Sequence, residues 1–220
     1  MDEKHASFII DFETVKEQKQ KHMENALMEL YEKLFTYIDK EANIREKVRA
    51  KQIFSHKTGI PAEYILEHNT ALHFEHWFAF DYITVTGSRM FDLFVREKQE
   101  ELTKPMLDLS GFMMLMALEP VHIKAVEDDE IIFSGALDSS GGEREAVFFL
   151  KSSFSIKEGD TVFLRIVRAG FKNFIIGPPF AVADSDVADI LSEIKTAGKE
   201  GRVRKYLKES GIDYLRHKKG

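Results

Sequence analysis

The first 119 residues repeat apolar side chains at the spacing of α-helices. Between residues 14 and 40 these side chains advance by three or four positions and fall on one helix face: Met23, Leu27, Leu30, Leu34 and Ile38. Residues 16–22, which precede that stripe, are polar on every side and are expected to project into solvent. The stripe spans only about two heptads, which leaves open whether this helix pairs with a helix of another chain.

More helical segments follow before the pattern changes. We expect helices over residues 44–54, from Pro61 to Tyr82, from Ser88 onward, and from Thr103 to Leu118. The last of these is apolar on nearly every side, so it should lie at the centre of a helical domain or be covered by a partner. The phenylalanines and methionines of this half therefore allow a protein partner, or a second copy of the chain, to bind here.

After Pro120 the apolar period becomes two, as in β-strands. Five short strands with tight turns are expected over residues 121–126, 130–137, 144–150, 161–167 and 173–177. Such strands favour a small five-stranded β-barrel of the SH3-like or OB-like kind. The predicted fold is α+β, with a helical domain (1–119), a small β-barrel (120–180) and C-terminal helices with a basic tail (181–220).

The stretch H73-F-E-H-W-F-A-F-D-Y82 is the densest in chemistry-bearing residues and has three interpretations. His73 and His76, spaced i, i+3, could reach one metal ion, but two imidazoles without a third ligand make a weak site. A base-stacking platform would need Lys or Arg beside its rings, and the stretch has neither. Trp77, Phe74 and Phe78 share one face of the helix, so we expect them to be buried in the core.

Asp81, Arg89 and Asp92 raise a further alternative near the end of that helix. They could form an active-site cluster, or they could pair structurally across a helix-turn-helix. Because Asp81 stands among aromatic residues, burying its charge alone would be costly. We therefore expect Arg89 or a backbone N–H group to satisfy its carboxylate.

Three motifs together resemble a group of uncharacterised bacterial proteins. These are W77-F-x-F-D-Y, G87-S-R-x-F-D-L-F and K157-E-G-D-T-V-F-L-R-I-V, and the similarity covers roughly residues 74–179. In that group such a region often accompanies a Cys-rich zinc knuckle of the type found at the SecA C-terminus. This chain has no cysteine, so the knuckle is absent. The resemblance implies an architecture more than an activity, and no catalytic residue is carried over from it.

Composition narrows the possible chemistry. The absence of cysteine excludes disulfides, thiol nucleophiles and thiolate metal sites. The chain lacks the phosphate-loop, dinucleotide-binding and nucleophile-elbow motifs, so a non-catalytic protein without a cofactor is favoured. Two alternatives stay open: general acid–base pairs, and a metal enzyme built on His73 and His76. No signal peptide or membrane-spanning run is recognised, which predicts a cytoplasmic protein.

Charge is distributed unevenly along the chain. Residues 195–220 carry nine Lys or Arg and three acids, a net charge of +6, whereas the rest of the chain carries −12. This tail could serve RNA or DNA, an acidic protein, or the acidic body itself. With the strand residues Lys151 and Arg165 as further support, the predicted nucleic-acid contacts are Arg168, Lys172, Arg202, Arg204, Lys205 and Lys208. A protein-interaction adaptor that uses the helical half is the alternative.

Overall fold

The computed structural model describes residues 2–138, 141–150, 155–198 and 201–219, and the chain in them begins with helices. The N-terminal part contains two short 3-10 turns, η1 (Ala62–Tyr64) and η2 (Gln99–Glu101), and five α-helices: α1 (Asp2–Glu41), α2 (Ile44–Thr58), α3 (His68–Phe80), α4 (Met90–Lys98) and α5 (Lys104–Leu115). None of the helices in the described part is long and apolar enough to cross a bilayer.

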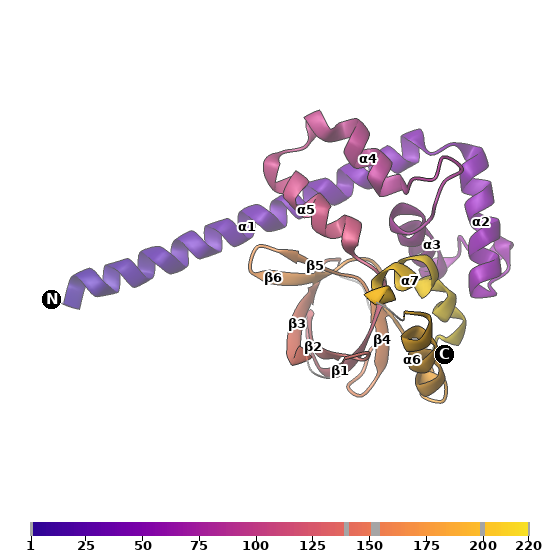
Figure 1. The fold of residues 1–220 in the computed structure, drawn as a ribbon. Helices are drawn as coiled ribbons and strands as arrows, with labels where there is room; N and C mark the ends of the chain where they lie inside the picture. The colour runs from indigo at the N-terminus through magenta and orange to yellow at the C-terminus, as the bar shows by residue number, and fades with distance from the viewer. Residues whose placement is uncertain (1, 139–140, 151–154, 199–200, 220) are drawn as a thin grey trace.

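Helix α1 extends beyond the rest of the molecule at its N-terminal end (Figure 1). Of the polar stretch 16–22, all residues but one are exposed as predicted, whereas Gln20 is buried. Further along the helix, Leu27, Leu30 and Leu34 are fully buried. Helix α2 then begins at Ile44 after the N-cap residue Asn43, whose side chain accepts a hydrogen bond from the Arg45 amide (2.8 Å). This cap turns the chain sharply, so that α1 and α2 diverge.

The segment between α2 and α3 differs from the prediction of one helix that starts at Pro61. The chain forms η1, bends where Ile65 enters the core with no exposed surface, and only then begins α3 at His68. This bend leaves the neighbouring side chain of Leu66 on the surface, 56% exposed.

The strands form one mixed, open sheet. Their bounds are β1 (Glu119–Glu127), β2 (Glu130–Gly135), β3 (Glu143–Phe148), β4 (Thr161–Leu164), β5 (Ile166–Ala169), β6 (Lys172–Ile175) and β7 (Phe180–Ala181). The order is β5-β6-β3-β2-β1-β4-β7, with β3 and β6 parallel and the other neighbours antiparallel. Because β5 and β7 end the sheet without pairing to each other, the predicted closed five-stranded barrel is wrong.

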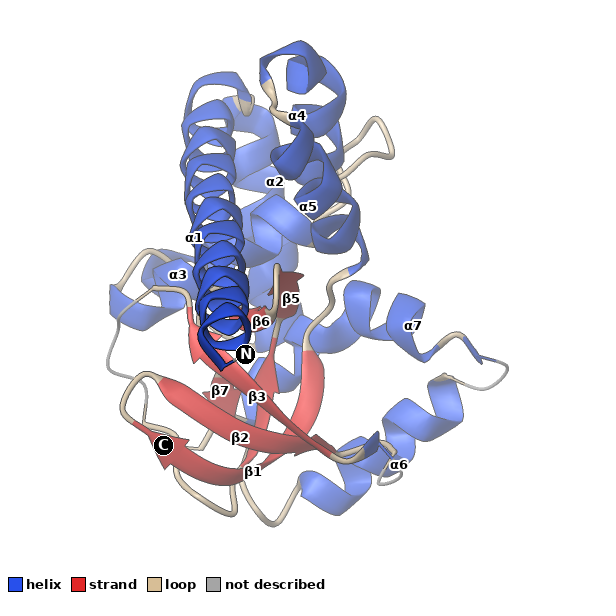
Figure 2. Ribbon diagram, turned by 90° about the vertical axis from the view of Figure 1, so that its left-hand side faces the viewer, coloured by secondary structure: helices blue, strands red, loops and turns tan. Residues whose placement is uncertain are grey.

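Two local features explain the difference. The single strand expected over residues 161–167 is divided at Arg165, after which the chain leaves β1 and pairs with β6. Pro178 and Pro179 end the pairing of β6, but Phe180 then pairs with Phe163 of β4 and adds a seventh strand. Since one residue separates β4 from β5 and they lie far apart in the sheet order, the sheet is strongly curved (Figure 2).

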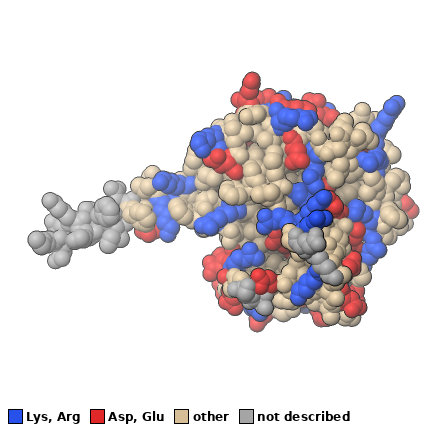
Figure 3. All heavy atoms as spheres, in the orientation of Figure 1, with Lys and Arg blue, Asp and Glu red and all other residues tan. Residues whose placement is uncertain are grey.

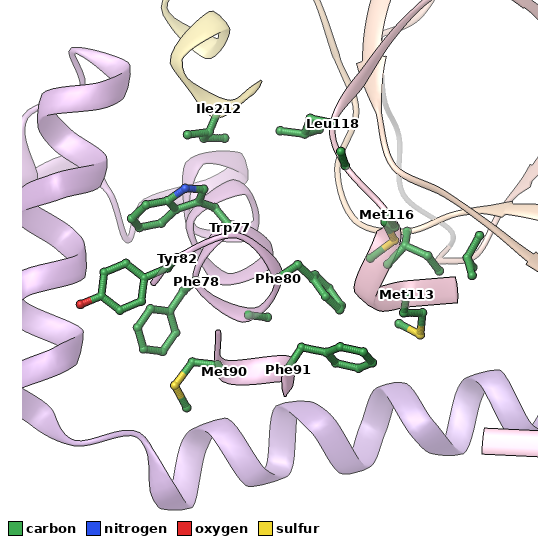
Figure 4. Close-up of a cluster of buried hydrophobic side chains, with 14 of the residues drawn as sticks. Trp77, Phe78, Phe80, Tyr82, Met90, Phe91, Met113, Met116, Leu118 and Ile212 are labelled. Atoms are coloured by element: carbon green, nitrogen blue, oxygen red, sulfur yellow. The ribbon is translucent and has the colours of Figure 1, made fainter. Parts of the chain in front are cut away.

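The C-terminal helices α6 (Val187–Ala197) and α7 (Val203–Ser210) and the 3-10 helix η5 (Gly211–His217) pack beside the sheet and the helical half. The main core lies between these parts. Figure 4 shows Trp77 and Phe80 of α3 beside Phe91 of α4, Met113 of α5 and Ile212 of η5, all of them buried. The three segments of the chain therefore share one large apolar core.

Candidate functional site

His76 lies in the middle of α3 and uses both of its ring nitrogens. Its Nδ1 is 2.8 Å from the carbonyl oxygen of Leu72, and its Nε2 is 2.7 Å from the hydroxyl of Tyr31. Because a carbonyl oxygen only accepts, Nδ1 carries the proton and the Tyr31 hydroxyl donates to Nε2. Burial lowers the pKa of His76 to about 3, so the ring is neutral and has no free nitrogen for a metal.

His73 and the aromatic stripe of α3 belong to the core. His73 is 3% exposed, its ring lies edge-on to Phe180 with centroids 5.6 Å apart, and burial lowers its pKa to about 3. The expected burial of Phe74, Trp77 and Phe78 is confirmed, since each is at most 6% exposed. Within the residues that the structure describes, no three His, Asp or Glu side chains gather into a group that could hold a metal ion.

Asp81, at the C-terminal end of α3, forms a buried ion pair with Arg165. The Nη2 atom of Arg165 donates to the carboxylate, and the two side chains are 3% and 1% exposed. The partner of Asp81 is thus Arg165, the residue that divides β4 from β5, whereas the sequence suggested Arg89 or a backbone N–H group. Arg165 is correspondingly unavailable as a surface cation, and Lys151 lies outside the described residues.

Lys208 also turns inward, at the junction of α7 with the end of α5. Its Nζ donates to the carbonyl oxygen of Met116 (2.9 Å), and burial lowers its pKa to about 8, while Asp81 partly opposes this shift. Lys208, predicted to contact nucleic acid, is therefore buried and bonded within the fold. Arg89 lies 4.0 Å from Asp92, so the suspected cluster is a set of structural ion pairs around the helix–sheet junction.

Several other cations of the C-terminal segment bind the protein's own oxygens. Lys219 reaches Asp160 (3.1 Å) and Asp184 (3.3 Å), and Arg216 donates to the backbone carbonyls of Asp213 in η5 and Lys57 in α2. The remaining predicted contacts on this tail, Arg202, Arg204 and Lys205, are exposed at the start of α7. Part of the +6 charge thus stabilises the fold, and part is on the surface.

Arg168 and Lys172 are exposed on the β5–β6 hairpin, beside the exposed ring of Phe171. Gln20 of α1 fixes this hairpin, because its side chain accepts from the Phe171 amide (2.7 Å) and donates to the carbonyl of Ala169 (3.2 Å). Figure 3 shows Lys and Arg on α1, near the hairpin and around α7, with Asp and Glu and uncharged surface between them. The view does not show one continuous positive face.

A groove of about 520 Å³ opens in the helical half, between the C-terminal part of α1, the outer side of α2 and α3. Most of its lining is apolar, and four charged residues stand among the apolar ones: Phe35, Ile38, Asp39, Ile44, Lys47, Val48, Lys51, Leu66, Phe74, Glu75 and Phe78. Ile44 is 70% exposed, Val48 54% and Leu66 56%. Exposed aliphatic residues that adjoin one groove are typical of a binding surface, whereas scattered ones need no explanation.

Helix α2 makes the wall of this groove with one regular line of residues. Ile44, Lys47, Val48 and Lys51 follow the spacing i, i+3, i+4, i+7, which aligns them on one helix face. Lys47 lies 3.9 Å from Asp39, while Lys51 has no hydrogen bond or ion pair among the described residues. The wall is therefore apolar with a positive edge.

Comparisons with protein families, curated proteins and solved structures found no match for this chain. The resemblance to proteins that carry a zinc knuckle consequently stays a prediction. What the chain binds is inferred from its own surfaces, and the groove combines a cavity with exposed apolar residues.

Sequence reasoning missed this groove, although one signal was present. The stretch I44-R-E-K-V-R-A-K51 places aliphatic and basic residues at helical spacing, and the adjoining side of the same helix supplies Ala50 and Phe54 to the core. An apolar line that extends beyond the core-facing side of a helix can mark a binding face. The bend at Ile65, which places Leu66 on the groove, had no recognisable sequence signal.

Proposed function

We propose that this protein is a non-catalytic protein-interaction module that holds an acidic amphipathic helix of its partner in the groove between α1, α2 and α3. The observation that carries the proposal is the exposed aliphatic set Ile44, Val48 and Leu66 at the edge of an apolar cavity. Burial of such side chains is worth about 1.5–3 kcal/mol each, which is enough for a few anchors to hold a partner.

The shape of the groove favours a helix as the bound element. An amphipathic helix presents anchors at i, i+3, i+4 and i+7, and the α2 wall offers its own residues at this spacing. The groove floor consists of the rings of Phe35, Phe74 and Phe78, which can pack against aliphatic or aromatic anchors. Two helices packed in this way contact each other through interlocking ridges.

Charge favours an acidic partner. Helix α2 carries five Lys or Arg residues and only one acid, Glu46. Arg49 and Lys57 of this set bind groups within the protein, and Arg45 is not part of the groove lining. The two cations along the groove are Lys47, which is paired with Asp39, and Lys51. Asp39 and Glu75 line the same groove, and partial burial raises the pKa of Glu75, which makes this carboxylate easier to neutralise than an ordinary surface acid.

The test uses the full chain and two designed helical peptides. Both peptides have the same apolar face, and the polar face consists of Glu in one peptide and of Lys in the other. We expect the Glu peptide to bind and to change the fluorescence of Trp77, the single tryptophan, whose ring lies 6.2 Å from that of Phe74 in the groove. Val48→Glu should weaken binding at least about tenfold, a loss near 1.4 kcal/mol. His56→Glu, on an exposed part of α2 outside the lining, is the matched control. Equal binding by Val48→Glu and wild type would refute the proposal.

Nucleic-acid binding is a second candidate, now centred on the β5–β6 hairpin. Phe171 is 54% exposed, and the Nζ atom of Lys16 lies 5.9 Å from the centre of its ring, with Arg168 and Lys172 on the adjoining strands. An exposed ring among cations can stack a base of a single strand while the cations contact phosphates.

This second candidate is tested by the salt dependence of binding to a generic single-stranded RNA. Three phosphate contacts at the hairpin would give a slope of roughly −2 in a plot of log affinity against log salt. Changing Arg168 and Lys172 to Glu should remove most of that slope, whereas changing Arg202, Arg204 and Lys205 to Glu tests the tail separately. Absence of salt-dependent RNA retention by wild-type protein at low ionic strength would exclude this candidate.

A further inference from the structure

The structure points to a particular occupant for the groove: we infer that it is residues 2–15 of α1 from a second copy of this chain. This inference rests on the proposed function, because it needs the groove to accept an acidic amphipathic helix. It goes further by naming the partner, and it implies that the protein associates with itself through its helical half.

The sequence of this segment has the chemistry that the groove requires. Residues 2–15, D-E-K-H-A-S-F-I-I-D-F-E-T-V, contain four acids and one Lys, and they lie within helix α1. Phe8, Phe12 and Val15 follow the spacing i, i+4, i+7 of a helix-in-groove ligand. The segment is thus negative and apolar, whereas the α2 wall is positive and apolar.

The part of this segment whose side chains are described makes little contact with its own molecule. Phe12 is 61% exposed and Val15 is 44% exposed, and α1 extends past the rest of the protein at this end (Figure 1). Isolated helices of moderate length are marginal in water, and most of their stability in proteins comes from packing of an apolar face. A helix that carries exposed Phe and Val beyond the body would therefore gain from a partner.

The segment cannot reach the groove of its own molecule while α1 stays one helix. The groove includes Phe35, Ile38 and Asp39 of the same helix, which is continuous from Asp2 to Glu41. At 1.5 Å per residue, roughly 40 Å of helix separates Phe12 from Ile38. Occupation by this segment therefore requires another copy of the chain.

The experiment measures the mass of the full-length protein in solution by sedimentation and light scattering over a range of concentrations. We expect concentration-dependent self-association of the wild type. The segment variant, Phe12→Glu with Val15→Glu, and the groove variant, Val48→Glu with Leu66→Glu, should each raise the dissociation constant at least about tenfold. The matched control is Gln18→Glu with Asn25→Glu, which adds the same charge at exposed positions of α1 and should associate like wild type.

Mixing the variants gives a sharper test. The segment variant keeps an intact groove and the groove variant keeps an intact segment, so an equal mixture should form a mixed species that neither variant forms alone. A charge exchange should behave likewise: Lys47→Glu with Lys51→Glu should weaken association, and Asp11→Lys with Glu13→Lys in the same chain should restore it. Circular dichroism of every variant is the control that checks whether the variant is folded.

The outcomes separate this inference from the proposed function. If the wild type is a monomer at every concentration but the Glu peptide binds the groove, the second copy is not the occupant and the proposed function stands. If the peptide fails to bind even the segment variant, whose groove is vacant, both fall. Association that survives in both the segment and the groove variants would place the contact elsewhere and overturn the inference. Tighter peptide binding by the segment variant than by wild type would support both.

Discussion

Lowering the pH from 7 to 5 should destabilise this protein strongly because α3 buries two neutral histidines. His73 and His76 are 3% and 1% exposed, and burial lowers the pKa of each from 6.5 to about 3. In the folded protein both rings therefore stay neutral through this range. In the unfolded chain each ring takes up a proton near pH 6.5, so the unfolded state binds more protons and gains stability relative to the folded state as the pH falls.

The size of the effect follows from the two pKa values. For one histidine with a pKa of 6.5 unfolded and about 3 folded, linkage gives a loss of about 2 kcal/mol between pH 7 and pH 5. The two histidines together should thus remove about 4 kcal/mol from the free energy of unfolding. This is a large fraction of the 5–15 kcal/mol that is typical of a domain. Below pH 3 the folded rings would titrate too, and the loss would level off.

Urea unfolding followed by Trp77 fluorescence at pH 5, 6 and 7 measures the loss. His76→Gln keeps an acceptor for Tyr31 and cannot titrate, so its free energy of unfolding should fall by about 2 kcal/mol less than that of wild type over the same pH range, whatever its stability at pH 7. His56→Gln, at an exposed position of α2, should behave as wild type. If wild type and His76→Gln lost equal stability between pH 7 and pH 5, the buried neutral histidine would not be the cause.

Three further substitutions test the packing directly by chemical denaturation. Trp77→Ala should lower stability by about 3–5 kcal/mol because it empties a buried aromatic site, and a loss under 1 kcal/mol would contradict the burial. Arg165→Met should cost about 3–5 kcal/mol by leaving the carboxylate of Asp81 buried without its partner, and adding Asp81→Leu should recover part of that loss; no recovery would argue against the pair. Gly177→Ala should cost about 1–3 kcal/mol, since φ is +77° and a Cβ would lie 2.4 Å from His76; an unchanged midpoint would contradict this contact.

Local patterns predicted the elements of this fold better than their assembly. The stripe of α1 and the change of period near residue 120 identify helices followed by strands because each depends only on nearby residues. The closed barrel was wrong because it depends on pairing between distant strands. The division of β4 from β5 at Arg165 coincides with an ion pair to Asp81, which lies 84 residues away in the sequence. The spacing of apolar residues within the strands does not predict this pair.

The candidate contacts show the same limit. Lys208 and Lys205 look alike in the basic C-terminal sequence, but Lys205 is exposed and Lys208 donates to a carbonyl of the helical half. Only the position of α7 beside Met116, at the C-terminal end of α5, distinguishes them. In α2, both Phe54 and Val48 are apolar, and only the position of the core decides that Phe54 is buried and Val48 lines the groove.

Helix α3 connects the groove to the sheet because one of its sides lines the groove and the other packs against the strands. One side carries Phe74 and Phe78 into the floor of the groove. The other side carries His76 against Gly177, and the helix ends at Asp81, whose ion pair joins it to the sheet. Since α3 is held by the strands behind it, the groove floor is fixed before a ligand arrives, and binding would not have to order it. The buried charges of this protein therefore bear on the proposed interaction by positioning the helix that presents the apolar surface, without contacting the partner themselves.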